Sequence, residues 1–416
     1  MKNKIGQILF IVITIAICSA SIAQSLMWQK LAHPDSLQVN GVSFAANGTK
    51  VASATNCHPA VIRLYDAPNG NITWDYTVGG GLMCMMGVGI SSNSQYLATV
   101  EEWGNLLIFD YTQNPPDSIA TINMASNYAY SMCFSPNSNK IAAGCTSGKL
   151  KVFEIPGGHM SLNISAHSSA VNTVTYSHNN LQIASGGADH HIKVWDTLGT
   201  LIQTLNGHTG AITSLKYLPG DSILVSSSKD NTIKIWNVST GALINTITVS
   251  GADVNAIDVS PNGNFVITVS ADNAIRIWNL TNYLLLSTFG DASLGQPLCV
   301  SWSPVNDQAI VGTSMGMVAM YDISSSLTAV EDINKRPQIT VYPNPCSEFV
   351  YIDLSANSVK TIELYDLMGK RIFFKNQILD RTGLFTLNMK DYRKGTYILR
   401  IVDAGNKITV KKLIKE

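Results

Sequence analysis

Residues 188–196 read ADHHIKVWD, and they place a carboxylate, Asp189, beside two imidazoles, His190 and His191. These side chains bind transition metals and transfer protons, so the stretch is a candidate metal or acid–base site. A metal site needs further ligands converging on the pair, and the spacing of the remaining histidines indicates none. What these residues do therefore depends on the elements that position them.

The surrounding sequence is an internal repeat. An apolar segment ending in an aromatic residue followed by Asp, Asn or Glu recurs at steps of 41 to 44 residues. Such regular spacing indicates a repeat architecture. The seven dipeptides are Tyr65-Asp66, Phe109-Asp110, Phe153-Glu154, Trp195-Asp196, Trp236-Asn237, Trp278-Asn279 and Tyr321-Asp322.

Each period divides into four short strands separated by turn residues, as in AVNTVTYS, QIASGG, HIKVWD and TLIQTLNGH between residues 170 and 208. One four-stranded sheet cannot bury both of its faces alone. Seven such sheets stacked around an axis bury each face on a neighbour. We therefore predict an all-β chain: a seven-bladed β-propeller of four-stranded antiparallel blades, followed by a small β-sandwich.

The segment GHTGAITSLKYLPGDSILVSSSKDNTIKIWN (207–237) resembles a repeat of the WD-repeat β-propeller family. The resemblance covers residues 26–323 and is strongest in repeats four to six. It implies that an N-terminal strand, LMWQKLA (26–32), completes the last blade and closes the ring. The propeller domain would span residues 24–326.

The same resemblance implies a structural role for Asp189. In this family an aspartate six residues before the tryptophan bonds a histidine in the preceding loop, and a strand serine and the tryptophan complete the network. Two repeats carry all four residues: His167, Ser185, Asp189 and Trp195, and then His208, Ser226, Asp230 and Trp236. Repeat six keeps Asp272 but has Ser250 where the histidine would be. His190 and His191 are then expected in an exposed turn and strand start.

Two other motifs lie in turns between strands. Glu101, Glu102 and Trp103 are a candidate ligand rim or a solvated turn, because acidic and aromatic side chains suit polar or sugar-like partners. The segment GTSMG (312–316) spells the GxSxG nucleophile motif with Ser314 at its centre, but that motif needs a strand-to-helix turn, which the repeat does not provide.

The N-terminus has the pattern of a secretory signal peptide. Residues 1–23 have a basic start, an apolar run from Ile5 to Cys18 and small residues before Gln24. Six cysteines follow it without a CxxC pair, so a zinc knuckle is not expected. Cys57 and Cys84 should lie near the same end of the ring, and one disulfide between them is an open alternative.

After a link at residues 327–338, the sequence changes to alternating strands that predict a β-sandwich over 339–416. This segment is similar to the C-terminal sorting domain of type IX secretion cargo, which occurs in Bacteroidota. The resemblance implies passage across the outer membrane and a secreted or cell-surface location. The residues that carry it are Tyr342, Pro343, Asn344, Pro345, Gly369, Lys370, Gly395 and Tyr397.

Charge argues against a nucleic-acid ligand. Residues 24–326 hold 11 basic and 18 acidic side chains, a net charge of −7, whereas phosphate binding needs clustered Lys and Arg. We therefore predict a non-catalytic binding module, monomeric, with no cofactor, metal ion or catalytic residue, that holds a protein or glycan on its loops. The alternative is a secreted propeller hydrolase or lyase with acidic residues in the central channel. Carboxylates or histidines converging on the channel would favour the enzyme.

Overall fold

The computed structural model describes residues 25–32, 38–56, 60–77, 84–113, 115–124, 128–249, 251–327, 340–342, 346–353, 359–367, 369–376, 384–403 and 408–416. The chain divides into two compact units, Met1–Leu327 and Thr328–Glu416. The predicted signal peptide lies outside the described residues. Among the described residues, no helix has the length and apolar character needed to cross a membrane.

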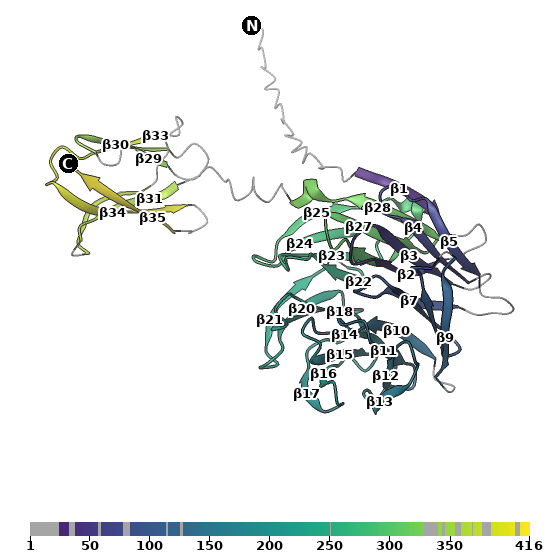
Figure 1. Ribbon diagram of the computed structural model, residues 1–416. Helices are drawn as coiled ribbons and strands as arrows, with labels where there is room; N and C mark the ends of the chain where they lie inside the picture. The colour runs from purple at the N-terminus through teal and green to yellow at the C-terminus, as the bar shows by residue number, and fades with distance from the viewer. Residues whose placement is uncertain are drawn as a thin grey trace, which may run out of the picture. The chain divides into compact units, whose positions relative to one another are not determined.

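The first unit consists of seven four-stranded antiparallel sheets, which confirms the predicted all-β propeller (Figure 1). The first three blades contain the following strands: blade one, β2 (Val39–Phe44), β3 (Lys50–Thr55), β4 (Val61–Asp66) and β5 (Ile72–Thr77); blade two, β6 (Met85–Ile90), β7 (Tyr96–Glu101), β8 (Asn105–Asp110) and β9 (Asp117–Asn123); blade three, β10 (Ala129–Phe134), β11 (Lys140–Cys145), β12 (Lys149–Glu154) and β13 (Met160–Ser165).

The next three blades repeat this order, and a short 3-10 helix, η1 (Ala292–Leu294), follows them. Their strands are as follows: blade four, β14 (Val171–Tyr176), β15 (Gln182–Gly187), β16 (Ile192–Asp196) and β17 (Leu201–Leu205); blade five, β18 (Ile212–Tyr217), β19 (Ile223–Ser228), β20 (Thr232–Asn237) and β21 (Leu243–Thr248); blade six, β22 (Val254–Val259), β23 (Phe265–Ser270), β24 (Ile275–Asn279) and β25 (Leu285–Phe289).

Blade seven joins the two ends of the propeller sequence. Its strands are β26 (Pro297–Trp302), β27 (Gln308–Thr313), β28 (Met317–Asp322) and, in the outermost position, β1 (Ser25–Leu31), which pairs antiparallel with β28 (Figure 1). On β1, Trp28 is buried against Tyr65 of blade one, with ring centroids 5.8 Å apart, and its Nε1 donates to Ala67 O at 2.7 Å. The N-terminal strand therefore ties blade seven to blade one.

Apolar side chains hold the blades together. The first strand of each blade packs on the first strand of the next, and β2 packs on β26 to close the circle. The fourth residue of each first strand lies in an apolar cluster between adjacent blades. Since side chains alternate along a strand, the fifth residue points the opposite way, and in blades one and six it contacts the first strand of the next blade through Ser43 and Asp258. The fourth residues are Val42, Val88, Met132, Val174, Leu215, Ile257 and Val300.

The second unit is built from two antiparallel sheets around one apolar core that includes Ile352, Ile362 and Leu399. One sheet has the order β29 (Thr340–Tyr342), β30 (Phe349–Asp353) and β33 (Leu384–Asn388). The other has the order β32 (Arg371–Asn376), β31 (Val359–Tyr365), β34 (Gly395–Asp403) and β35 (Ile408–Lys415).

Candidate functional site

The structure brings together both sets of four residues that the sequence grouped in repeats four and five. In blade four, His167 Nδ1 lies 2.9 Å from Asp189 Oδ1, and His167 Nε2 lies 2.8 Å from Ser185 Oγ. Trp195 Nε1 donates to the same Ser185 Oγ at 2.9 Å. Ser185 is fully buried, so its hydroxyl cannot reach a substrate. Asp, His and Ser are also the residue types of a catalytic triad. Here, however, their hydrogen bonds join the loop before the blade to its second and third strands.

Blade five repeats the arrangement. His208 Nδ1 lies 2.8 Å from Asp230 Oδ2 and His208 Nε2 lies 2.7 Å from Ser226 Oγ, which accepts from Trp236 Nε1 at 2.8 Å. Burial lowers the pKa of His208, as it does that of His167, against the raising effect of the aspartate partner. A neutral imidazole can donate from Nδ1 and accept at Nε2, which matches its two partners.

Blade six keeps half of this network. Trp278 Nε1 donates to Thr268 Oγ1 at 3.2 Å, a threonine in the serine position. Asp272 accepts from Arg276, with Nη1 and Oδ1 3.1 Å apart. The hydrogen bond from Arg276 lowers the pKa of Asp272, although burial opposes it. Ser250 lies outside the described residues. An arginine on the third strand thus takes the place of the missing histidine.

The remaining sequence candidates lie in turns. His190 and His191 are exposed between β15 and β16, and His190 has a positive φ of 70°. Ser314 lies in the turn between β27 and β28, where its hydroxyl accepts the Gln296 N–H at 2.9 Å. Neither turn gathers groups for catalysis among the described residues, which contain no group of three His, Cys, Asp or Glu side chains that would hold a metal ion.

The turn after β7 separates the three residues of the candidate rim. Glu101 is 3% exposed and accepts from Asn105 Nδ2 at 2.8 Å, so its carboxylate serves the turn itself. Glu102 is partly exposed and Trp103 is 57% exposed. Only these two side chains reach solvent. Sequence reasoning missed the burial of Glu101 because strand-end residues alternate between inside and outside, and the register was not known.

Cys84, which directly precedes β6, is disulfide-bonded. The described cysteines Cys133, Cys145, Cys299 and Cys346 are free. The partner of Cys84 lies outside the described residues, as does Cys57, with which the sequence paired it.

The second unit positions the residues of the sorting motif in turns and at strand ends. Gly369 has a φ of 78° in the turn after β31, where Lys370 N donates to Asp366 Oδ1 at 2.9 Å. Gly395 begins β34, and the nearby Tyr397 hydroxyl donates to Arg393 O at 2.6 Å. Tyr342 ends β29. Pro343, Asn344 and Pro345 lie outside the described residues.

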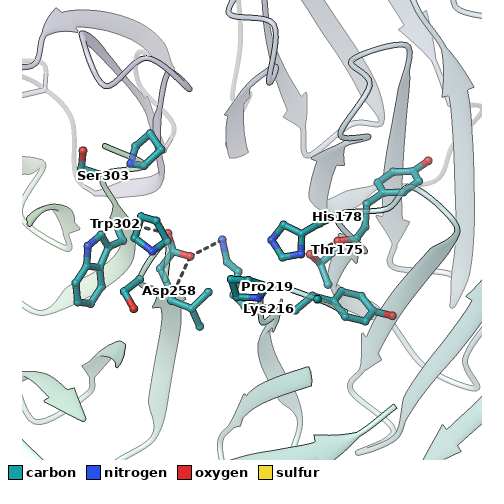
Figure 2. Close-up of a pocket in the computed structure, with 14 residues that line it drawn as sticks. Thr175, His178, Lys216, Pro219, Asp258, Trp302 and Ser303 are labelled. Carbon is teal, nitrogen blue, oxygen red and sulfur yellow. Dashed lines mark hydrogen bonds and ion pairs between the residues drawn. The ribbon is translucent and has the colours of Figure 1, made fainter. Parts of the chain in front are cut away.

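A cavity of about 550 Å³ opens where the first strands of blades four to seven end at the channel. This is the first-turn end of the ring, where each first strand turns into the second. The turn with Trp103 joins a second strand to a third and so lies at the opposite end. The polar side chains at the cavity include Thr175, His178, Lys216, Asp258 and Ser303, and Trp302 forms part of its wall (Figure 2).

Among the residues that line the cavity, Lys216 and Asp258 form an ion pair between neighbouring blades, with Nζ and Oδ1 3.0 Å apart (Figure 2). Asp258 also accepts two backbone N–H groups: Val259 N at 2.9 Å from Oδ1 and Trp302 N at 2.8 Å from Oδ2. Burial acts against the charge of Lys216, but Asp258 outweighs this effect and raises the lysine pKa. Lys216 is therefore protonated at neutral pH.

A second pair lies at the same end of the ring. His178, in the turn after β14, bonds Asp221, in the turn after β18, with Nδ1 and Oδ1 2.7 Å apart. Asp221 also accepts His178 N at 2.7 Å and Asn179 N at 2.9 Å. Burial opposes the charge of Asp221, but these hydrogen bonds outweigh it and lower its pKa. Nε2 of His178 has no partner among the described residues, and 57% of its side chain is exposed.

Comparisons with known proteins agree with this architecture. Residues 128–377 match the family model described as IFT122 first beta-propeller, a match that runs past the last blade. Residues 340–416 match the secretion system C-terminal sorting domain. The chain belongs to the WD-repeat β-propeller family and carries a type IX secretion sorting domain, which indicates secretion or export to the cell surface.

Curated relatives share only parts of the chain. A WD repeat-containing protein, SL1-17, from Schistosoma mansoni is 25% identical over 37% of this chain and 50% of its own length. WD repeat-containing protein 3 from Homo sapiens is 30% identical over 18% of this chain and 8% of its own length. A U3 small nucleolar RNA-associated protein 15 homolog from Xenopus tropicalis is 30% identical over 21% of this chain and 17% of its own length. The chain thus spans half or less of these relatives.

Proposed function

We propose that this protein is an exported, non-catalytic binding module, in which the propeller is a rigid frame that holds a protein or glycan partner. The observation that carries the proposal is the combination of a closed ring with an open cavity at its channel and a sorting domain for export. Rigid scaffolds present recognition residues on their loops and turns at little entropic cost. The molecule acts as a monomer and reaches the outside through its N-terminal signal and then the type IX machinery of a Bacteroidota-like cell.

The chemistry of the cavity supports binding more than hydrolysis. Glycoside hydrolysis in its usual form requires a pair of carboxyl groups, one to donate a proton and one to act as base or nucleophile. Among the residues that line the described cavity, Asp258 is the one carboxylate, and both of its oxygens are engaged. A hydrolase or lyase at this site would therefore lack a free acid–base pair.

The secreted protein, purified from culture medium, tests the binding proposal on glycan and protein arrays. We expect a partner whose binding is saturable. A screen of glycoside and lactone substrates that found turnover, lost in Asp258→Asn, would instead establish the enzyme.

Export is tested separately. We expect the secreted chain to lack residues 1–23 by intact mass, and a chain ending before Thr340 to remain in the periplasm. Secretion of that truncated chain at the normal level would contradict the assignment of the sorting role.

A further inference from the structure

The fifth position of the first strands departs from the repeat in two adjacent blades. The fifth residue of these strands is small and uncharged in five blades, and it is lysine or aspartate in the other two. The seven residues are Ser43, Gly89, Cys133, Thr175, Lys216, Asp258 and Ser301. Blade geometry alone does not require charge here, because five blades form without it.

Part of the role of Asp258 is structural. Ser43 Oγ accepts the N–H of Ile90 in the next blade at 3.2 Å, and Asp258 accepts the N–H of Trp302 in the corresponding place. An uncharged acceptor therefore suffices for the contact between first strands. Lys216 makes no such backbone contact among the described residues, and the ion pair with Asp258 is its one link to the next blade there.

His178 and Asp221 are further departures near the same cavity. Where His178 stands, blades three, five, six and seven have Pro136, Pro219, Pro261 and Pro304. Asp221 is acidic at a turn position of positive φ that blades two, three and four fill with the uncharged residues Ser94, Ser138 and Asn180. Asp221 holds His178 in place through Nδ1 and leaves its Nε2 open.

The hydrogen-bonding capacity left over in the cavity belongs mainly to Lys216. An ammonium has three donors, and Asp258 is the one partner of Lys216 among the described residues. The lysine side chain is 37% exposed and that of Asp258 only 12%. The carboxylate is thus covered and fully bonded, whereas the ammonium faces the cavity with donors to spare.

We propose that this cavity binds a small ligand through an oxyanion, a carboxylate or a phosphate, that accepts hydrogen bonds from Lys216, with His178 as a second polar contact. The proposal rests on the binding role argued above and assigns it a site and a ligand chemistry. Charge-assisted hydrogen bonds from an ammonium to an oxyanion are roughly twice as strong as neutral ones. The cavity volume of about 550 Å³ falls within the range of small-molecule sites.

Lys216 is suited to binding an oxyanion in this cavity. The ion pair with Asp258 raises the pKa of Lys216, which keeps it protonated, and holds Nζ 3.0 Å from Asp258 Oδ1 in the cavity lining. The aromatic and proline side chains of the wall, including Trp302, Tyr217 and Pro219, exclude water from one side of a bound ligand. An oxyanion there would be attracted more strongly than in open solvent, because the effective dielectric constant is lower.

Calorimetric titration of the full chain tests the proposal, with D-glucuronate as carboxylate probe, inorganic phosphate as phosphate probe and D-glucose as uncharged control. We expect one of the two anions to bind and D-glucose to bind at least tenfold more weakly. Lys216→Met should weaken anion binding at least tenfold, and Lys216→Arg should stay within about threefold, because it keeps the cation. Lys229→Met is the matched control, since Lys229 is exposed in a turn at the other end of blade five.

The variant Asp258→Asn distinguishes an anion site from a purely structural ion pair by the direction in which anion affinity changes. Removal of the competing carboxylate should strengthen anion binding, whereas a purely structural ion pair predicts no gain. In the wild-type chain, the bound anion should also slow reductive methylation of Lys216 relative to Lys229, a readout that requires no variant to fold. Equal binding by wild type and Lys216→Met, or an unchanged methylation ratio at saturating probe, would overturn the proposal. Binding of neither anion alongside a partner found on the arrays would refute the oxyanion site and leave the binding role standing.

Discussion

His208 and Asp230 join the loop before blade five to the turn between its second and third strands, with Nδ1 and Oδ2 2.8 Å apart. Both side chains are nearly inaccessible to solvent, at 0% and 7% exposed. The contact is linked through Ser226 to Trp236, so one chain of hydrogen bonds spans loop, turn and two strands. The same relationship between His167 and Asp189 holds blade four.

Removing a histidine from this network should destabilise the propeller. His208→Ala leaves Asp230 and Ser226 short of a buried partner, and we expect a loss of about 2–4 kcal/mol in the free energy of unfolding. Urea denaturation measures this value. His191→Ala is the control, since His191 is exposed in a turn of blade four, and it should change stability by less than about 0.5 kcal/mol. Equal effects of the two variants would contradict a structural role for the network.

Stability should fall as the solution becomes mildly acidic. Burial lowers the pKa of His167 and of His208 below the ordinary value of 6.5, so the folded state keeps these imidazoles neutral while the unfolded chain takes up protons. Their contribution is complete above pH 6.5 and is lost as the pH falls from 6.5 toward the lowered pKa values. Thermal midpoints between pH 8 and pH 5 measure the slope. The double variant His167→Asn/His208→Asn should show a shallower decline, and an identical slope would exclude these two residues as its source.

Trp28 should be essential to closure of the ring. It is 8% exposed, stacks on Tyr65 and donates to Ala67 O. Trp28→Ala should lower the free energy of unfolding by about 3–5 kcal/mol and should expose β1 to limited proteolysis. Trp28→Phe keeps a ring but loses the hydrogen bond, so it should cost less. A stable Trp28→Ala protein with a protected β1 would show that the other strand contacts suffice for closure.

The disulfide of Cys84 should connect it to Cys57. Five of the six cysteines after residue 23 are accounted for, four as free thiols and Cys84 as bonded. Non-reducing peptide mapping of the secreted protein should recover a Cys57–Cys84 peptide, with the other four thiols alkylated after denaturation without reductant. Cys84→Ser should cost about 2–4 kcal/mol, the usual range for loss of a disulfide. Recovery of alkylated Cys84 from unreduced protein would contradict the assignment.

Much of the fold could be predicted because a repeat multiplies each local signal. An aromatic residue at the end of a third strand is weak evidence in one place, but seven of them at even steps indicate seven stacked sheets. The network residues were predicted from the resemblance to WD repeats, and His167 and His208 stand at equivalent points of adjacent repeats. Blade six shows the limit of this reasoning, because Arg276 reaches Asp272 by side-chain length and not by its place in the motif.

The sequence by itself determined the architecture of this protein: seven blades, the strand that closes them, the hydrogen-bonded partners of Asp189 and Asp230, and the sorting domain. The seven blades follow from strand alternation and repeat spacing, which are local properties, whereas the closing strand, the partners of Asp189 and Asp230 and the sorting domain follow from the resemblance to known families. The tertiary structure alone decided where the unusual residues meet. Lys216 and Asp258 lie 42 residues apart in sequence and His178 lies in a third blade, yet all three line one cavity, because a closed ring brings the ends of successive first strands to one opening. The structure also showed that Glu101 is buried and not part of an exposed rim, because the register of β7 turns its side chain inward.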